Sequence, residues 1–306
     1  MTSRRDGDPT GEVAGTGGIV VVDKPAGMTS NDVVARARKA LRTRRIGHAG
    51  TLDPMATGVL VLGVGRATKL LGHLAGADKT YTATIRLGQA TGTDDAEGDV
   101  VSAASAAGVG ADALRATIAS FVGDIEQVPS SVSAIKVDGR RAYARVRAGE
   151  PVQLAARRVH IGRIDVAAIR RVEDLLDVDV ELDCSAGTYV RALARDVGAR
   201  LGVGGHLTAL RRARVGSFDL MAAVTLETLA QQAESAVISL DDVTGRVFGR
   251  RDLDADEARV VANGGRLRMA GIDGAYGAYD TDGQVIALMT ETDGAARPLV
   301  VLRPAG

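Results

Sequence analysis

The sequence predicts an α+β protein with a mixed, largely antiparallel central sheet flanked by helices, followed by a small C-terminal all-β domain. Two segments, 80–87 and 176–184, alternate apolar and polar residues with the period of antiparallel strands that bury one face. Other segments carry apolar residues at helical spacing. After about Thr244, short β-like runs are separated by Gly and Asp turns, which predicts the separate β domain.

The first predicted elements are a strand and a helix joined by a turn. Gly18–Val22 is an apolar, β-branched run that ends at the turn sequence DKPAG. Thr29, Ser30 and Asn31 offer N-cap side chains, and apolar residues then recur at helical spacing, which predicts an amphipathic helix. The rest of the circumference of this helix is basic and carries Arg36, Arg38, Lys39 and Arg42.

Two further helices and three C-terminal strands are predicted. Apolar residues at 114, 118 and 121 indicate a helix that follows a surface loop at 102–110. A second helix runs from Val190 to Leu201 and ends at Gly202. The C-terminal β-like runs are Arg266–Met269, Gln284–Met289 and Leu299–Leu302.

The 306 residues divide into three predicted parts. Residues 1–17 mix charged residues with Gly and Thr, lack the apolar core of a secretory signal, and are predicted to be a disordered leader. Residues 18–245 form the main domain, and residues 246–306 form the small one. Within the main domain, residues from about 126 to 151 are predicted to be a basic excursion from the sheet.

The composition excludes several classes of protein. No run approaches the length of about 18 uncharged apolar residues that indicates a transmembrane helix. Cys184 is the only cysteine, which excludes an intrachain disulfide and, without an export signal, predicts a cytoplasmic protein. The four histidines lack HExxH spacing, so we expect no metal. Walker A, GxGxxG and GxSxG motifs are absent, and we expect no cofactor. Because no long apolar run is present, we expect no membrane partner either.

The charge is balanced in total but segregated along the chain. The 38 basic residues equal the 38 acidic ones in number. Asp53 is nevertheless the only acid between Asp32 and Asp78, and Asp196 is the only acid in the arginine-rich segment 184–218. Acidic residues gather elsewhere, as in 94–99 and 173–183. A solvated basic face is the commoner explanation of one such stretch, but two stretches together favour contacts with nucleic-acid phosphates.

Asp53 is the strongest candidate for chemistry. It lies in the sequence GTLDP, where Gly50 and Pro54 shape the backbone around a single carboxylate. An ordinary turn aspartate is the alternative, because Asp-Pro is a frequent turn dipeptide. The surrounding cations favour the ionised carboxylate, which suits a nucleophile better than a general acid.

Arg191 is the second candidate, because it falls in the first turn of a predicted helix. The positive end of a helix is unfavourable for an arginine unless an anion lies close by. Its position therefore indicates a carboxylate or phosphate partner, with an ordinary exposed arginine as the alternative.

Five sequence motifs resemble those of the TruB family of tRNA pseudouridine synthases. They occur in the expected order between Gly18 and Ala213 and read DKPAGMTS (23–30), GHAGTLDPMATG (47–58), KTY (79–81), GTYVR (187–191) and HLTALRR (206–212). The resemblance implies a pseudouridine synthase fold for residues 18–245. For the C-terminal residues it suggests a PUA-like domain only through the general pattern of short β-like runs separated by Gly and Asp turns.

The resemblance also implies roles for individual residues. Asp53 would be the catalytic nucleophile, Arg191 its partner, and Tyr81 the aromatic residue that packs on the target uracil and is a candidate for removing the C5 proton. Leu210 would pack against the same base. The chemical path stays open among addition of Asp53 to C6, attack on C1′ and a glycal intermediate.

Five more residues are implied to bind the RNA or support the pocket. His48 resembles the histidine that inserts into the T loop, Tyr189 a residue of the pocket, and Lys24 a support of the active-site loops. Arg141 and Tyr143 match the RNA-gripping excursion.

The implied partner is tRNA, bound at its T arm and elbow and modified at position 55. No obligate protein partner is expected, and the chain is predicted to be a monomer. A tRNA-folding chaperone, in which remodelling of the RNA is the main activity, is the alternative.

Overall fold

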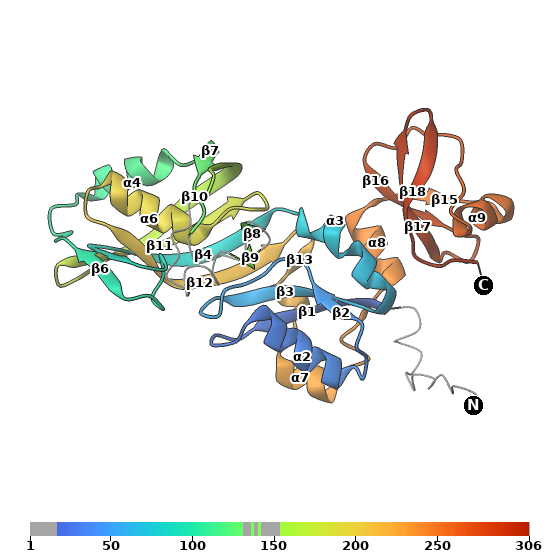
Figure 1. Ribbon diagram of the computed structural model, residues 1–306, viewed down its shortest axis with the longest axis horizontal. Coiled ribbons are helices and arrows are strands. Elements are labelled where there is room, and N and C mark those ends of the chain that lie inside the picture. The colour runs from blue at the N-terminus through green and yellow to red at the C-terminus, as the bar shows by residue number, and fades with distance from the viewer. Residues whose placement is uncertain (1–16, 131–135, 138–139, 142–153, 306) are drawn as a thin grey trace.

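The computed structural model describes residues 17–130, 136–137, 140–141 and 154–305 (Figure 1). The predicted leader, 1–17, lies outside the described residues except for Gly17. Most of the predicted excursion, 126–151, lies outside them as well.

A ten-stranded mixed sheet forms the centre of the protein. Its main path has the order β14-β1-β3-β12-β4-β11-β10-β7, with β2 paired to β3 and β13 paired to β12. Every pairing is antiparallel except that of β12 with β3, which is parallel. The strands are β1 (Gly18–Lys24), β2 (Ile46–His48), β3 (Thr57–Val64), β4 (Lys79–Leu87), β7 (Gly123–Gln127), β10 (Arg157–Val172), β11 (Leu175–Cys184), β12 (Gly205–Val215), β13 (Phe218–Asp219) and β14 (Ile238–Ser239).

The sequence pattern explains how these strands are buried. In β4 and β11 the predicted alternation is confirmed, and the apolar residues of the two strands face one another in register, as Tyr81 does with Leu182. β1 and β3 are almost entirely apolar because the sheet is covered on both faces there. Leu60 and Leu62 of β3 join one core cluster, whereas Val59 and Val61 join the other.

Helices cover both faces of the sheet (Figure 1). The predicted N-cap at Thr29 is confirmed, because its hydroxyl accepts a hydrogen bond from the Asp32 amide while the Asp32 carboxylate accepts one from the Thr29 amide. The helices that accompany the ten-stranded sheet are α2 (Ser30–Ala40), α3 (Leu71–Ala75), α4 (Ala111–Ala119), α6 (Val190–Arg200), α7 (Leu226–Gln231) and α8 (Leu240–Val247), with 3-10 turns η1 (Gly65–Leu70) and η2 (Leu220–Ala222). α2 packs beside α7, and α4 beside α6.

A second sheet forms the C-terminal region. It has the order β15-β16-β17-β18 and comprises β15 (Gly249–Asp252), β16 (Ala275–Tyr279), β17 (Val285–Thr292) and β18 (Ala295–Val301). One helix, α9 (Ala255–Ala262), accompanies it. Side chains of Arg66 and Lys69 in η1 donate hydrogen bonds to the carbonyls of Leu302 and Val301, which ties the second sheet to the main domain.

The predicted fold class is confirmed, and one predicted strand is wrong. Arg266–Met269 forms only an isolated bridge between Leu267 and Ala296, because the neighbouring residues of this run are exposed. Two short hairpins complete the description: β5 (Gln89–Thr91) with β6 (Val100–Ala103), and β8 (Lys136–Val137) with β9 (Arg140–Arg141). Among the described residues, no helix is both long and apolar enough to cross a membrane.

Candidate active site

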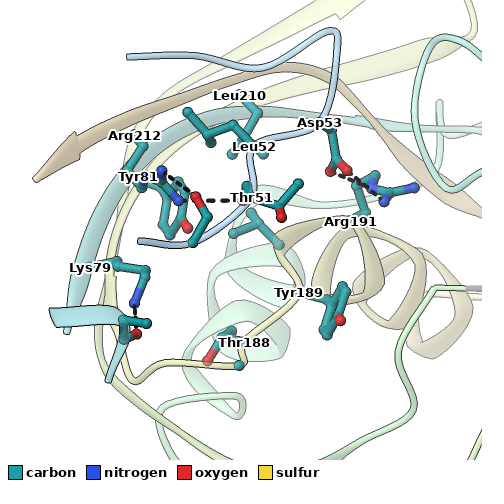
Figure 2. Close-up of a pocket in the computed structure, with 14 residues that line it drawn as sticks. Thr51, Leu52, Asp53, Lys79, Tyr81, Thr188, Tyr189, Arg191, Leu210 and Arg212 are labelled. Atoms are coloured by element: carbon teal, nitrogen blue, oxygen red, sulfur yellow. Dashed lines mark hydrogen bonds and ion pairs between the residues drawn. The ribbon is translucent and has the colours of Figure 1, made fainter. Parts of the chain in front are cut away.

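A pocket lies where the loop before β3, the strands β4 and β12, and the N-terminus of α6 meet (Figure 2). It brings together five of the predicted site residues, namely Asp53, Tyr81, Tyr189, Arg191 and Leu210. These residues come from four separate parts of the chain, which the order β3-β12-β4 of the sheet places side by side.

The loop that carries Asp53 is held by the turn between β1 and α2. The buried Ser30 hydroxyl accepts a hydrogen bond from the Leu52 amide at 2.9 Å and donates one to the Leu52 carbonyl at 3.1 Å. The Gly27 amide donates to the Pro54 carbonyl at 2.9 Å. The motif DKPAGMTS therefore fixes the backbone on both sides of Asp53, and this explains why a turn distant in sequence matters to the site.

Lys24 reinforces the same junction from inside the protein. Its fully buried ammonium donates to the carbonyls of Pro25, Met28 and Pro54 at 2.9, 2.6 and 3.1 Å. Burial lowers the pKa of Lys24 to about 8, and the negative charge of Asp53 opposes this shift. Lys24 is absent from the pocket lining, and its ammonium contacts backbone carbonyls on both sides of this junction.

Arg212 holds the other side of the loop. Arg212 is 1% exposed, and its guanidinium donates to the carbonyls of Val59, Gly50 and Thr51. Gly58 makes this approach of β12 to β3 possible, because its φ is +99° and an added Cβ would lie 2.2 Å from the Arg212 carbonyl oxygen.

Arg191 forms a two-point ion pair with Asp53. Its Nε lies 2.9 Å from Asp53 Oδ2, and its Nη2 donates to Asp53 Oδ1 at 3.0 Å. The Arg191 side chain is 5% exposed and that of Asp53 is 33% exposed, so the carboxylate is the more accessible member of the pair, and both residues line the pocket (Figure 2). Its position in the first turn of α6 predicted an anionic partner, and the structure supplies one.

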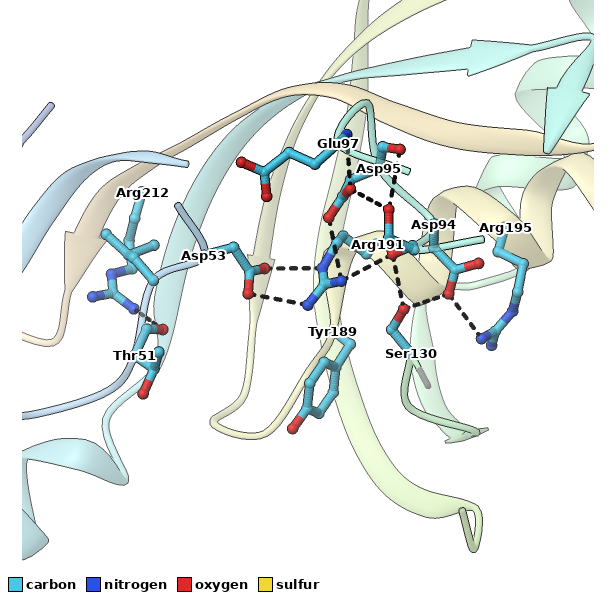
Figure 3. Close-up of polar contacts among 12 residues, drawn as sticks. Thr51, Asp53, Asp94, Asp95, Glu97, Ser130, Tyr189, Arg191, Arg195 and Arg212 are labelled. Carbon is cyan, nitrogen blue, oxygen red and sulfur yellow. Dashed lines mark hydrogen bonds and ion pairs between the residues drawn. The ribbon is translucent and has the colours of Figure 1, made fainter. Parts of the chain in front are cut away.

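A second carboxylate completes the surroundings of Arg191. Its Nη1 lies 3.2 Å from Asp95 Oδ2 and donates to the Thr93 carbonyl at 2.9 Å (Figure 3). Two carboxylates thus contact one buried guanidinium, which holds the arginine in a fixed orientation toward Asp53.

Apolar and aromatic side chains form the walls next to Asp53. Tyr81 on β4 and Leu210 on β12 are each 7% exposed, and both line the pocket. Burial raises the pKa of the Tyr81 phenol, while a hydrogen bond from Arg212 opposes this shift, so the hydroxyl is neutral near neutral pH. Tyr189 caps α6, and its backbone amide donates to the Gln127 side chain at 2.8 Å.

Lys79 adds a third cation to the pocket. Its ammonium donates to the carbonyls of Ala75 and Ala77, and burial lowers its pKa. Asp53 is therefore a partly exposed carboxylate paired with Arg191, in a pocket that has apolar walls and that Lys79 and Arg212 also line. Such a carboxylate is suited to nucleophilic attack, or to stabilising positive charge on a planar substrate held against the walls.

The remaining predicted residues lie apart from the pocket. His48 is half-buried at the end of β2 and is absent from the pocket lining. Arg141 belongs to the short strand β9, where only the backbone is described. Tyr143 lies outside the described residues.

Sequence reasoning missed the roles of several residues that build the site. Arg212 and Lys79 fall inside the quoted motifs, yet their contacts with backbone carbonyls have no signature in the sequence. Asp95 lies in an acidic cluster that the charge pattern assigns to a different region, and only the fold brings it to Arg191.

Burial raises the pKa of the Cys184 thiol to about 11, so this residue stays protonated.

Three family models match consecutive parts of the chain. The TruB family pseudouridylate synthase N-terminal domain matches residues 38–190. The tRNA pseudouridylate synthase B C-terminal domain matches residues 191–244, and the tRNA pseudouridine synthase II C-terminal domain matches residues 248–303.

Curated relatives match almost the whole chain. A tRNA pseudouridine synthase B from Mycolicibacterium paratuberculosis is 60% identical over 288 residues, which cover 94% of this chain and 98% of the relative. The protein of the same name from Mycobacterium tuberculosis is 57% identical and covers 94% and 96% of the two chains.

Solved structures share the fold at lower identity. A chain in the crystal structure of a Cbf5-Nop10-Gar1 complex is 25% identical, with a TM-score of 0.71 and coverage of 96% of this chain and 87% of that one. A chain in the archaeal box H/ACA sRNP Nop10-Cbf5 complex is also 25% identical, with a TM-score of 0.70 and coverage of 99% and 93%.

Proposed function

This chain belongs to the TruB family of pseudouridylate synthases, and from that premise we propose that it converts the uridine at position 55 in the T loop of tRNA to pseudouridine. The chain is an RNA pseudouridine synthase that isomerises uridine in tRNA. The reaction breaks the C1′–N1 bond and forms a C1′–C5 bond. C5 loses a proton and N1 gains one, so the isomerisation consumes no oxidant, reductant or nucleotide.

The ion pair of Asp53 with Arg191 carries the assignment of the catalytic residue. Arg191 holds the carboxylate in a fixed orientation through two contacts, and the partial exposure of Asp53 leaves it accessible to a substrate. We assign to Asp53 the attack on the substrate, either at C6 or at C1′, or the promotion of a glycal path.

Tyr81 and Leu210 hold the base in this proposal. A uracil placed against these two buried side chains would present its edge and its sugar to Asp53. The Tyr81 phenol lies in the same pocket as Asp53 and is neutral, so it is a candidate to take the C5 proton only as a relay: it releases its own hydroxyl proton to water as it accepts that proton, and water supplies the proton that N1 gains. Tyr189 adds a further aromatic surface to the pocket lining.

Nucleotide flipping is part of the proposal. A uridine stacked in the T loop cannot reach a carboxylate that lies within a pocket, so the nucleotide has to leave its stack. His48 is assigned to the vacated position in the loop. His48 lies on β2, five residues before Asp53 in the sequence, and does not line the pocket itself.

RNA contacts outside the pocket are assigned to basic residues. Arg141 and Tyr143 would grip the T arm, and exposed basic residues of α2 offer further phosphate contacts. We propose that the protein acts as a monomer on the T arm and elbow of tRNA. The Cbf5 chains of similar fold are seen in complexes with Nop10.

The test uses an unmodified tRNA transcript with 5-tritiated uridine and no added cofactor. We expect release of about one equivalent of tritium per tRNA, with pseudouridine mapped to position 55. A matched transcript with cytidine at position 55 should release no tritium. Release from another position, or release that persists with the cytidine transcript, would contradict the assigned position.

A tRNA-folding chaperone remains the alternative, and no observation favours it. The Asp53→Asn protein distinguishes the two. It should bind tRNA without releasing tritium under the proposed function, whereas a chaperone as main activity requires that it still accelerate tRNA folding as fast as the parent protein.

A further inference from the structure

A second arginine lies one helical turn after Arg191 on the same helix. Arg195 is four residues further along α6, so its side chain projects from the same face. Its Nη1 lies 3.2 Å from Asp94 Oδ2, and its Nη2 donates to the Val128 carbonyl at 2.7 Å (Figure 3). Arg191 contacts Asp95 and Arg195 contacts Asp94, so two neighbouring arginines bind two consecutive aspartates.

Asp94 adopts a backbone conformation that needs support. Its φ is +61°, in the left-handed region that residues other than glycine rarely adopt, and it is 9% exposed. Its Oδ2 accepts a hydrogen bond from Ser130 Oγ at 2.6 Å in addition to the contact with Arg195. The carboxylate of Asp94 thus has a cation and a hydroxyl as partners, and both come from outside its own loop.

Ser130 connects this pair to Arg191 through one backbone atom. The fully buried Ser130 hydroxyl lies 3.1 Å from the Thr93 carbonyl oxygen, which also accepts a hydrogen bond from Arg191 Nη1 at 2.9 Å. Thr93, Asp94 and Asp95 are consecutive, so a shift of Asp94 would move both acceptors of Arg191.

We propose that Asp94, Arg195 and Ser130 form a positioning unit that orients Arg191 and, through it, Asp53. The inference rests on the proposed role of Asp53 as the catalytic residue. None of the three residues lines the pocket, so they act on the reaction through Arg191 and not by contact with the base.

The physical reason lies in the two adjacent buried carboxylates. Without Arg195, the buried Asp94 carboxylate would have the Ser130 hydroxyl as its one side-chain partner among the described residues, which is unfavourable next to the Asp95 carboxylate. Asp94 would then lose an interaction that stabilises its left-handed backbone conformation. Asp95 would move away from Arg191, and the guanidinium would no longer be held by Asp95 as well as by Asp53.

The test compares Asp94→Asn, Arg195→Gln and the double variant. We expect the single-turnover rate of tritium release to fall about 10- to 100-fold for each single change, with tRNA affinity within about twofold of the parent protein, because the unit positions the catalytic pair and does not bind RNA. The double variant should lose little more than either single one, because both changes disrupt the same unit. Arg195→Lys should recover part of the rate.

The matched control is Arg200→Gln on the same helix. Arg200 bonds to Ser120 and stacks on the Phe121 ring at 4.3 Å, away from Asp94. Its removal should leave the rate unchanged while costing similar stability. If Arg195→Gln does not fold, Asp94→Asn, which keeps the shape of the side chain, provides the measurement.

Three results would overturn the inference. They are unchanged rates in both single variants, a loss of affinity at an unchanged rate, or an equal loss of rate in Arg200→Gln. The parent protein and Asp53→Asn are measured in the same assay. An inactive parent protein or an active Asp53→Asn would overturn the proposed function instead, so the two failures are distinguishable.

Discussion

Two stretches of the chain, residues 36–45 and 191–214, are both rich in arginine, but their basic side chains differ in burial and in their partners. In the first stretch, residues 36–45, the basic side chains are exposed on α2 and just after it, as for Arg36, Lys39 and Arg44. In the second stretch, residues 191–214, Arg191 and Arg212 are 4% and 1% exposed. Within the described residues, no basic side chain of the first stretch forms an ion pair, whereas Arg191, Arg195, Arg211 and Arg214 all do.

The difference shows that charge density alone does not distinguish a binding surface from an active site. Exposed cations without carboxylate partners are available to RNA phosphates, and their effect should depend on salt. Buried cations that bind carbonyls and carboxylates position the backbone and Asp53, and salt should affect them little. The predictions below follow from this contrast.

The largest effect is expected from Arg191→Gln. The change leaves Asp53 and Asp95 facing a neutral side chain, and one of the two carboxylates is buried. We expect the single-turnover rate to fall by about 1,000-fold or more, and the free energy of unfolding by about 3 kcal/mol. Tritium release and thermal unfolding measure the two quantities. A loss of tRNA affinity with an unchanged rate would show that Arg191 belongs with the phosphate-binding residues.

Arg212→Met should have the next largest effect. The substitution removes the donors to the carbonyls of Gly50, Thr51 and Val59 and leaves them without this partner. We expect a fall in rate of about 100-fold and a loss of stability of about 3 kcal/mol, without a change in the salt dependence of tRNA binding.

The control for this variant is Arg211→Met, which removes the adjacent residue of β12 and its ion pair with Asp23. Arg211 is half-exposed, so its loss should destabilise the protein less. An equal loss of rate in both variants would contradict the role given to Arg212.

Removing charge from α2 should change binding and leave chemistry intact. In the triple variant Arg36→Gln, Lys39→Gln, Arg44→Gln we expect about tenfold weaker tRNA binding. The plot of the logarithm of the binding constant against the logarithm of the salt concentration should have a slope shallower by about 2. The rate at saturating enzyme should stay the same. Affinity titrations across a range of salt concentrations measure this effect.

The matched control removes three charges elsewhere, in Arg115→Gln, Arg163→Gln, Arg170→Gln. Arg163 and Arg170 already form ion pairs with carboxylates of β10 or β11, so they should contribute less to RNA binding. Equal weakening in the two triple variants would mean that total charge, and not the α2 surface, governs affinity.

The smallest effect concerns Lys24 and pH. Its pKa of about 8 in the folded protein lies below its ordinary value of 10.5, so the unfolded chain binds the proton more tightly. The contribution of Lys24 to stability is therefore smallest below pH 8 and rises as the pH increases from about 8 toward 10.5. The stability difference between the parent protein and Lys24→Met should widen over this interval in denaturant titrations.

Asp53 sharpens this prediction because its charge raises the pKa of Lys24. When Asp53→Asn is present in both proteins, the stability difference caused by Lys24→Met should begin to widen at a lower pH. A stability difference that stays constant with pH in both backgrounds would contradict the burial of the Lys24 ammonium.

The sequence predicted the fold best where strands are regular. β4 and β11 alternate without interruption over their predicted length, and both were identified. β10 and β12 were not predicted, and both contain irregularities, for example between Ile161 and Arg163 and between Arg212 and Arg214. Each bulge shifts the alternation by one residue, so no single period describes the strand.

The site was predictable where residues belong to a motif. Asp53, Tyr81, Tyr189, Arg191 and Leu210 were all identified, and the structure places them in one pocket. The expectation of an anion near Arg191 came from its position on the helix alone. Asp95 was not identified as its partner because the contact joins residues 96 positions apart in the chain, and the fold, not local sequence, brings the segment between β5 and β6 to the N-terminus of α6.

The most direct test of the account measures rate and affinity together in Asp53→Asn. This change keeps the shape of the side chain and removes the charge that Arg191 binds. We expect tRNA binding within about threefold of the parent protein, and no tritium release above background in a single-turnover experiment. Measurable release at a rate near that of the parent protein, or a loss of binding that accounts for the whole loss of activity, would contradict the assignment of Asp53 as the catalytic residue.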